Sequence, residues 1–325
     1  MNIGLNASVQ KLLVAAGMLL TLTAQAAEPW PTRPIKIVIP FSAGGVQDTV
    51  ARAISNELGA ALGQPVIIEN RPGAGGTVAT SFVAKSAPDG YTLILAAASH
   101  HINGTLYSKL NYDPVKDFVG AAYIGNSSYI MVVNASVPVK SVTEFVAYAK
   151  ARPGQLNYAT AGTGSATHLA MAYFNGMAGL DIVNIPTKGA GEAINEVLSG
   201  RSQVMVNANN LALPFAKDDR VRLLGVTSEK PSPFVPGVEP IAAAVPGYVF
   251  DTWFGLLAPA GISPDIVNKL NSEMAKLVKR PEIVERLHKQ GIAPGSMGSE
   301  DFAQLLRRDF GRMAEVVKIS GAKVD

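Results

Sequence analysis

Residues 35–48 read IKIVIPFSAGGVQD, and the interpretation of the whole chain starts from this stretch. The β-branched run at 35–40 predicts a buried strand, and residues 48–62 predict a helix because their apolar side chains fall on one face. Gly44 and Gly45 allow the chain to turn tightly between the two. A strand that passes through a glycine turn directly into an amphipathic helix predicts an α/β fold with a parallel sheet.

The same alternation continues along the chain in two runs. The first run is completed by a strand at 66–69, a helix at 76–85 and a strand at 92–97. The second run has strands at 129–134, 157–159, 182–185, 204–207 and 223–226 and helices at 141–151, 167–177 and 190–199. Helices at 264–279, 281–289 and 299–318 follow, each introduced by a Pro or a Ser. We therefore expect two α/β lobes with parallel-rich sheets flanked by helices.

Two apolar and extended segments, 120–134 and 248–259, connect these runs. We interpret them as paired crossover strands. This interpretation places the first lobe at 27–124 plus 252–325 and the second lobe at 125–251. Two such crossings predict a hinge about which the lobes close over a cleft between them.

The composition excludes several classes of protein. The chain has 325 residues, of which 48% are hydrophobic and 16% charged, and it contains 31 Gly and no Cys. These values exclude a fibre, a coiled coil, a disordered tail and a disulfide scaffold. The 28 basic and 25 acidic residues nearly balance, and no run of Lys or Arg indicates nucleic-acid binding.

The N-terminus predicts the compartment. Lys11 precedes the apolar run 12–22, and the small-residue pattern Ala24-Gln25-Ala26 follows it. This arrangement is typical of a cleaved signal peptide, residues 1–26, and the apolar run is too short to span a bilayer. Because the chain has no Cys for a lipid anchor, we expect a free protein of the periplasm whose mature form begins at Ala27.

Two glycine turns are the main candidates for a ligand site, because ligands of α/β sheets bind beyond the carboxyl ends of strands. Each turn opens a helix, whose first amide groups and partial positive charge favour an anion. From the first turn we predict contacts by Phe41, Ser42, Gly45, Val46 and Asp48, with Asp48 capping its helix or binding a water or an amino group rather than a carboxylate. From the second turn we predict contacts by Gly162, Thr163, Gly164, Ser165, Thr167 and His168. The alternative, that both turns are ordinary tight connections, stays open.

Further candidates follow other strands. Ser99 and His100 come after the strand at 92–97; on a strand, His100 and His101 would point to opposite faces, which disfavours a shared metal site. Each histidine either lines the cleft or is a solvated loop residue. Asn207 and Asn209 follow the strand at 204–207, where they either donate to a ligand or form a turn.

Two motifs of known chemistry fail on inspection. The stretch GAGGTV at 73–78 lacks the third glycine of a dinucleotide loop, and no phosphate-binding Lys follows either turn. Ser165 and His168 lack a third group to orient a catalytic pair. The sequence therefore predicts no cofactor, no metal site and no catalytic residue.

Five stretches together resemble one family. They are WPTRPIKIVIPFSAGGVQDTVAR, PVIIENRPGAGGTVA, APDGYTL, GTGSATHLA and FDTWFGLLAPAG, in this order along the chain. The chain resembles the Bug family, the TctC-like periplasmic receptors of tripartite tricarboxylate transporters. The resemblance implies a two-lobed Venus-flytrap fold of the type II periplasmic-binding-protein kind. It also implies a small carboxylate, bound on loops that correspond to 41–48 and 162–168.

The resemblance further implies membrane subunits, one large and one small, as partners. We expect a monomer that binds no nucleic acid and whose ligand is a di- or tricarboxylate, an acidic amino acid, or an aromatic acid such as terephthalate. A periplasmic enzyme that acts on a small carboxylic acid is the alternative. The two differ in turnover, since a receptor returns its ligand unchanged.

Overall fold

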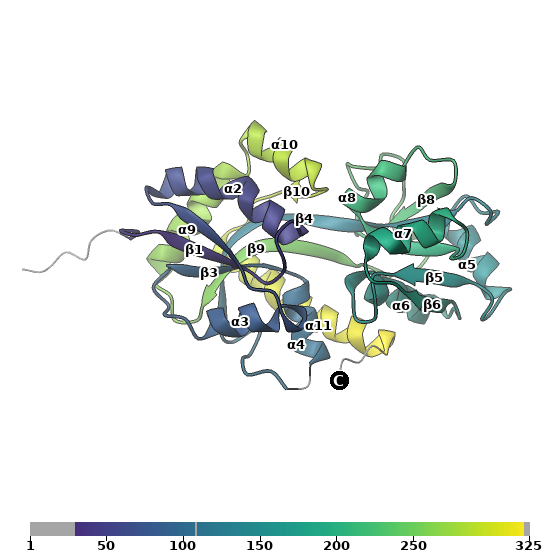
Figure 1. Ribbon diagram of the computed structural model, residues 1–325, viewed down its shortest axis with the longest axis horizontal. Coiled ribbons are helices and arrows are strands. Elements are labelled where there is room, and N and C mark those ends of the chain that lie inside the picture. Colours follow the sequence, from purple (N-terminus) through teal and green to yellow (C-terminus); the bar gives the residue numbers. More distant parts are fainter. Residues whose placement is uncertain (1–29, 108, 322–325) are drawn as a thin grey trace, which may run out of the picture.

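One continuous sheet runs through both lobes of the protein (Figure 1). The computed structural model describes residues 30–107 and 109–321, so the predicted signal peptide at 1–26 lies outside the described residues. Within the described residues, the strands follow the order β2-β1-β3-β9-β4-β7-β5-β6, and β8 and β10 pair with β4. The expected α/β class and two-lobed architecture are confirmed.

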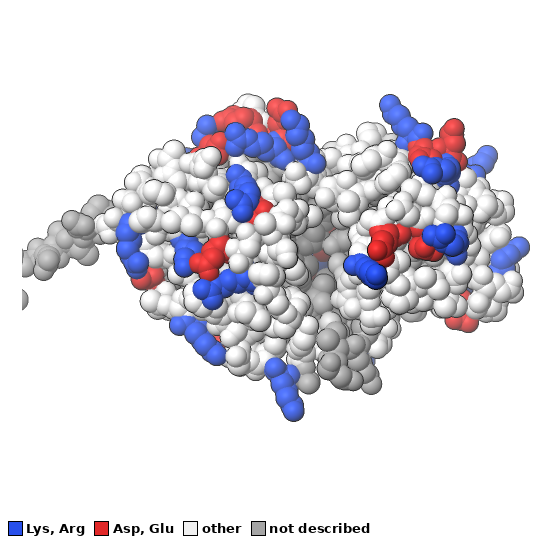
Figure 2. Space-filling model, viewed as in Figure 1, with Lys and Arg blue, Asp and Glu red and all other residues white. Residues whose placement is uncertain are grey.

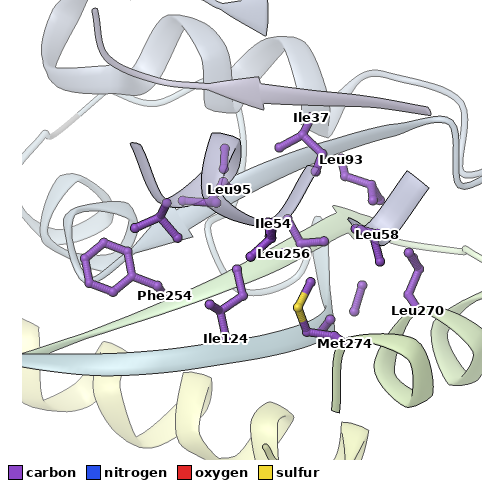
Figure 3. Close-up of a cluster of buried hydrophobic side chains, with 14 of the residues drawn as sticks. Ile37, Ile54, Leu58, Leu93, Leu95, Ile124, Phe254, Leu256, Leu270 and Met274 are labelled. Carbon is purple, nitrogen blue, oxygen red and sulfur yellow. The ribbon is translucent and has the colours of Figure 1, made fainter. Parts of the chain in front are cut away.

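The first lobe is built on a parallel trio of strands. These are β1 (Ile35–Ile39), β2 (Val66–Asn70) and β3 (Thr92–Ala97), and β9 (Asp251–Pro259) joins β3 antiparallel. One face carries α2 (Val46–Leu62), α9 (Pro264–Leu277) and α10 (Pro281–Lys289), and the other carries α3 (Thr77–Ala84) and the start of α11 (Ser299–Ser320). Because strand side chains alternate, Ile37 and Leu93 pack under α2 and α9 (Figure 3) while Val38 faces α3.

The second lobe repeats this construction. Its strands are β5 (Asn157–Thr160), β6 (Val183–Pro186), β7 (Val204–Ala208) and β8 (Val221–Val226). Its helices are α5 (Val142–Lys150), α6 (Ala166–Ala178), α7 (Ala190–Leu198) and the short α8 (Asn209–Ala212). Helices α5 and α6 cover one face of the sheet and α7 covers the other.

The long strand β4 (Phe118–Asn134) joins the lobes. Its first part pairs antiparallel with β9, from Phe118 opposite Pro259 to Ser128 opposite Asp251. From Tyr129 onward it pairs with β7 and β8 of the second lobe. The prediction of paired crossover strands is confirmed, and the partners of β4 change between Ser128 and Tyr129.

Helix α11 makes a third crossing that the sequence did not indicate. Its start packs on the first lobe through Phe302, whereas Met313 and Val316 belong to the core of the second lobe. In Figure 1 it runs, in yellow, from the first lobe to the lower edge of the second. The C-terminal helix therefore connects the lobes, whereas we expected from the sequence that all of 252–325 belongs to the first lobe.

Two elements were not expected from the sequence. Residues 99–106 form a helix, α4 (Ser99–Leu106), so His100 and His101, which follow β3, lie on a helix and not in a loop. Strand β3 ends at Ala97, Ala98 already has helical dihedral angles, and Ile102 packs into the second-lobe core. A two-residue strand, β10 (Ala293–Pro294), pairs with β4 near the hinge.

Candidate functional site

A cleft of about 970 Å³ lies between the lobes, at the upper end of the usual range for small-molecule sites. It is lined by the residues that follow β1 and β3 in the first lobe and β5 and β6 in the second. On the face in Figure 2, charged side chains gather on the outer surfaces of the lobes, and few border the groove between them. The site thus occupies the edge where strands end and helices begin, as expected for this class of sheet.

Four helices begin at this cleft. Val46, Ser99, Ala166 and Ala190 are the first residues of α2, α4, α6 and α7, and all four line it. Among the described residues, their backbone N–H groups have no protein acceptor. Each helix start carries roughly half a positive charge. The cleft therefore offers free donors and positive potential from both lobes to a bound anion.

The buried carboxylate of Asp48 holds the first turn in shape. Its Oδ2 accepts hydrogen bonds from Gly44 N and Arg52 Nε, both at 2.9 Å, and its Oδ1 accepts one from Asn70 Nδ2 at 3.0 Å. The hydrogen bond from Arg52 is the largest of the effects that lower the pKa of Asp48. Asp48 therefore stays charged and holds the turn, and it does not line the cleft.

The second turn is held by His168. Gly164, at φ +77°, donates its N–H to Nδ1 of His168 at 3.2 Å, and the hydroxyl of Ser165 accepts the N–H of His168 at 3.2 Å. Because Nδ1 accepts, the ring carries its proton on Nε2. Burial lowers the pKa of His168, which favours the neutral ring. The amide of Gly164 is thus engaged within the turn, whereas the expectation had it free for a ligand.

The cleft brings together eight of the predicted residues. They are Phe41, Ser42, Gly45, Val46, Ser99, Thr163, Gly164 and Ser165. Seven others do not line it: Asp48, His100, Gly162, Thr167, His168, Asn207 and Asn209.

Internal hydrogen bonds explain why most of these seven turn away. The hydroxyl of Thr167 accepts the N–H of Ala161 at 2.8 Å, and the carbonyl of Gly162 accepts the N–H of Ser165 at 3.2 Å. Nε2 of His100 donates to the carbonyl of Pro114 at 2.8 Å.

The two asparagines are buried behind the cleft. Asn209 donates through Nδ2 to the carbonyl of Gly291 at 3.1 Å, across the back of the hinge. Asn207 is fully buried, and its Oδ1 accepts the N–H of Ala208. Their neighbours Ala208 and Asn210 line the cleft instead.

Sequence reasoning missed a third turn. Lys188, Gly189 and Ala190 follow β6 and line the second-lobe wall. The stretch TKGAG at 187–191 contains two glycines directly after a predicted strand. The rule that singled out the first two turns would therefore have found this one as well.

Two charged side chains line the cleft within the described residues, and they differ in their pairing. Asp251 accepts a hydrogen bond at 2.6 Å from Nη1 of Arg312. Lys188 is exposed and has no carboxylate partner among the described residues. The charge of Asp251 is thus compensated by Arg312, whereas no carboxylate among the described residues compensates that of Lys188.

A buried network stands behind the cleft wall. Asp309 of α11 accepts hydrogen bonds from His101 Nδ1 and Trp253 Nε1, both at 2.7 Å, and from Arg312 at 2.6 Å. Burial raises the pKa of Asp309, but the bond from His101, the charge of Arg312 and the bond from Trp253 outweigh burial and hold that pKa below its usual value. Asp309 therefore ties α4 and β9 to the helix that crosses between the lobes.

The described residues hold neither a candidate metal-binding cluster nor a candidate membrane-spanning helix. No group of three His, Cys, Asp or Glu side chains that could hold a metal ion occurs among residues 30–107 and 109–321. In the same part of the chain, no helix is long and apolar enough to cross a membrane.

Known proteins share this architecture. The family model described as tripartite tricarboxylate transporter family receptor matches residues 50–321. Protein BugT of Bordetella pertussis is 31% identical over 98% of this chain and 99% of BugT. A solved structure of an R. palustris protein with adipate has a TM-score of 0.77 and 33% identity, over 91% of this chain and all of that one. MatC from Rhodopseudomonas palustris with bound malate has a TM-score of 0.73 and 33% identity, over 89% of this chain and all of MatC.

Proposed function

The chain belongs to the tripartite tricarboxylate transporter receptor family, and from this premise we propose that it binds a small organic carboxylate between its lobes and delivers it to the membrane subunits of such a transporter. Members of the family are periplasmic solute-binding proteins. The proposed ligand class agrees with the adipate and malate of the two R. palustris structures.

The convergence of four helix starts on one cleft is the observation that carries this proposal. Val46 and Ser99 present free amides from the first lobe, and Ala166 and Ala190 present them from the second. A carboxylate that leaves water needs charge-assisted hydrogen bonds in return, each worth about 1.5 to 3 kcal/mol. A ligand held from both lobes stabilises the closed conformation over the open one, which is the signal that a transporter can read.

Receptor function is favoured over catalysis by the side chains at the cleft. Among the described lining residues, the charged ones are Lys188 and the already paired Asp251, and no histidine is among them. General acid–base catalysis needs a positioned group with a pKa near the working pH. We therefore propose that the protein returns its ligand chemically unchanged.

A binding screen with product analysis tests both points. Thermal-shift measurements over mono-, di- and tricarboxylates should find acids that raise the melting temperature, and calorimetry should give one site per chain. Chromatography of the acid after long incubation should recover it intact. Absence of binding by every carboxylate would refute the receptor, and conversion of the acid would establish the enzyme.

Location and partners are proposed on the same basis. The signal peptide is proposed to end at Ala26, so N-terminal sequencing of exported protein should begin at Ala27. The mature protein is proposed to be a monomer, which sedimentation can test. Uptake of the bound acid into vesicles that contain the transporter's large and small membrane subunits should require this protein.

A further inference from the structure

The floor of the cleft, at the hinge, is formed largely by aromatic and aliphatic side chains. Tyr129 and Phe250 pack edge to face with their ring centroids 5.5 Å apart, and both line the cleft. Ile102, Leu106 and Phe254 extend this surface beside them. A ligand seated between the lobes therefore lays its middle part on aromatic and aliphatic side chains.

Two polar side chains of this floor, Ser127 and Thr252, are already engaged with the protein. The hydroxyl of Ser127 donates to the carbonyl of Gly291 at 2.8 Å. The hydroxyl of Thr252 accepts the N–H of Ala98 at 3.2 Å and donates to the carbonyl of Trp253 at 3.3 Å. A hydroxyl group on the middle of a ligand would give up its bonds to water for few new partners, and an unpaired buried polar group is costly.

Anion-binding groups lie instead on the walls. The first residues of α2 and α4 present free amides on the first-lobe side, and Lys188 adds a full positive charge to the amide of Ala190 on the second-lobe side. Asp251 near the hinge is negative and paired with Arg312, so a ligand carboxylate has no reason to approach the floor. The polar positions are thus separated by an apolar one.

We propose that the ligand is a dicarboxylate whose two acid groups are separated by an apolar spacer, a methylene chain or an aromatic ring. Lys188 is the specificity-determining residue for the second-lobe carboxylate. This inference rests on the proposed function, since it names which carboxylates the receptor takes. Short hydroxylated acids are discriminated against, because their hydroxyl groups would face Phe250, Phe254 and Leu106.

The first experiment compares three sets of acids by calorimetry. Adipate and terephthalate represent dicarboxylates with apolar spacers, malate and citrate represent hydroxylated acids, and hexanoate and benzoate represent monoacids. The first set should bind at least tenfold more tightly than either of the others. Tighter binding of malate or citrate, or equal binding of the monoacids, would overturn the inference while leaving the receptor function intact. If no acid binds, the proposed function itself fails.

The second experiment tests the residues on the tighter-binding diacid of adipate and terephthalate. Lys188→Met should weaken it by about tenfold, as expected for the loss of one charge-assisted hydrogen bond, and should change the affinity for the corresponding monoacid less. Lys217→Met removes an exposed lysine of the same lobe that does not line the cleft and should change neither. Equal effects of the two variants would refute the role of Lys188.

A third variant tests the floor. Leu106→Asn places an amide on the floor at a partly buried position at the end of α4. The affinity for the diacid should fall about tenfold, because a buried leucine side chain contributes roughly that much, and the affinity for malate should hold or rise. A parallel loss for both acids would contradict an apolar contact with the spacer.

Discussion

Acid should destabilise this protein through His100. The side chain is only 4% exposed and packs edge to face on Phe118, with ring centroids 4.8 Å apart. Its Nε2 donates to the carbonyl of Pro114, and its Nδ1 has no partner among the described residues. Burial, followed by the neighbouring His101, lowers the pKa of His100 from 6.5 to about 3, and the bond to Pro114 and the charge of Asp309 oppose this shift only in part.

The sign of the effect follows from proton linkage. Between pH 6.5 and pH 3 the unfolded chain binds a proton at His100 and the folded chain does not, so folding stability rises with pH in that window. A pH of 5 lies 1.5 units below 6.5, the pKa of His100 in the unfolded chain. Each unit corresponds to about 1.4 kcal/mol. Acidification from pH 7 to pH 5 should therefore remove about 2 kcal/mol of unfolding free energy through this residue alone.

Urea denaturation at the two pH values measures this loss. The wild type should lose about 2 kcal/mol more between pH 7 and pH 5 than His100→Gln, whatever the absolute stability of the variant. His288→Gln removes an exposed histidine and should keep the wild-type loss. Asp48, Asp309 and His168 also have lowered pKa values, so the difference between variants carries the information. An equal loss in His100→Gln and the wild type would refute the reasoning.

Three other measurements probe the turns and the hinge. Gly164→Ala and Gly179→Ala both place a side chain at positive φ, so each variant should lose about 1 kcal/mol of stability. Only Gly164→Ala should weaken ligand binding. Equal ligand affinities of the two variants would remove the second turn from the site. Asp48→Asn should lower the unfolding free energy by about 1 to 3 kcal/mol in urea titrations at pH 7, because the charged bonds to Gly44 and Arg52 are weakened, and a stability equal to wild type would contradict its role in the first turn. X-ray scattering should show a smaller radius of gyration with saturating ligand than without, and an unchanged radius would indicate a rigid pocket.

The fold could be predicted because its signals are local. In β1, the side chains on both faces of the strand are apolar: Ile37 points to one face and Val38 to the other. Such a strand must be covered by helices on both sides. The glycine turns that follow β1 and β5 could also be found from local sequence, and they form two of the walls of the cleft. Residue type and spacing were sufficient where the structure follows from neighbours in the chain.

The detailed contacts could not be predicted, because they depend on which atoms the fold leaves free. Thr167 and His168 have the right chemistry for an anion, but their polar atoms complete the turn that holds Gly164. Asn209 donates its side-chain amide to the carbonyl of Gly291 at the hinge, 82 residues away in the sequence. No local pattern distinguishes a polar group that serves the protein from one that serves a ligand.

Helix α11 limits how the two lobes can move relative to each other. Its first half packs on α4, whose start lines the cleft, and its second half enters the core of the second lobe. Arg312 and Asp309 anchor it to Asp251 and Trp253 of β9, at and near the start of that crossover strand. A hinge with two crossing strands and one crossing helix permits rotation about fewer axes than two strands alone. We therefore expect the three crossings to restrict the lobes to a narrow range of closures. Such a restriction would keep the amides of α2 and α4 opposed to those of α6 and α7, and a cleft that binds the proposed dicarboxylate would then select acids by the distance between their carboxylates.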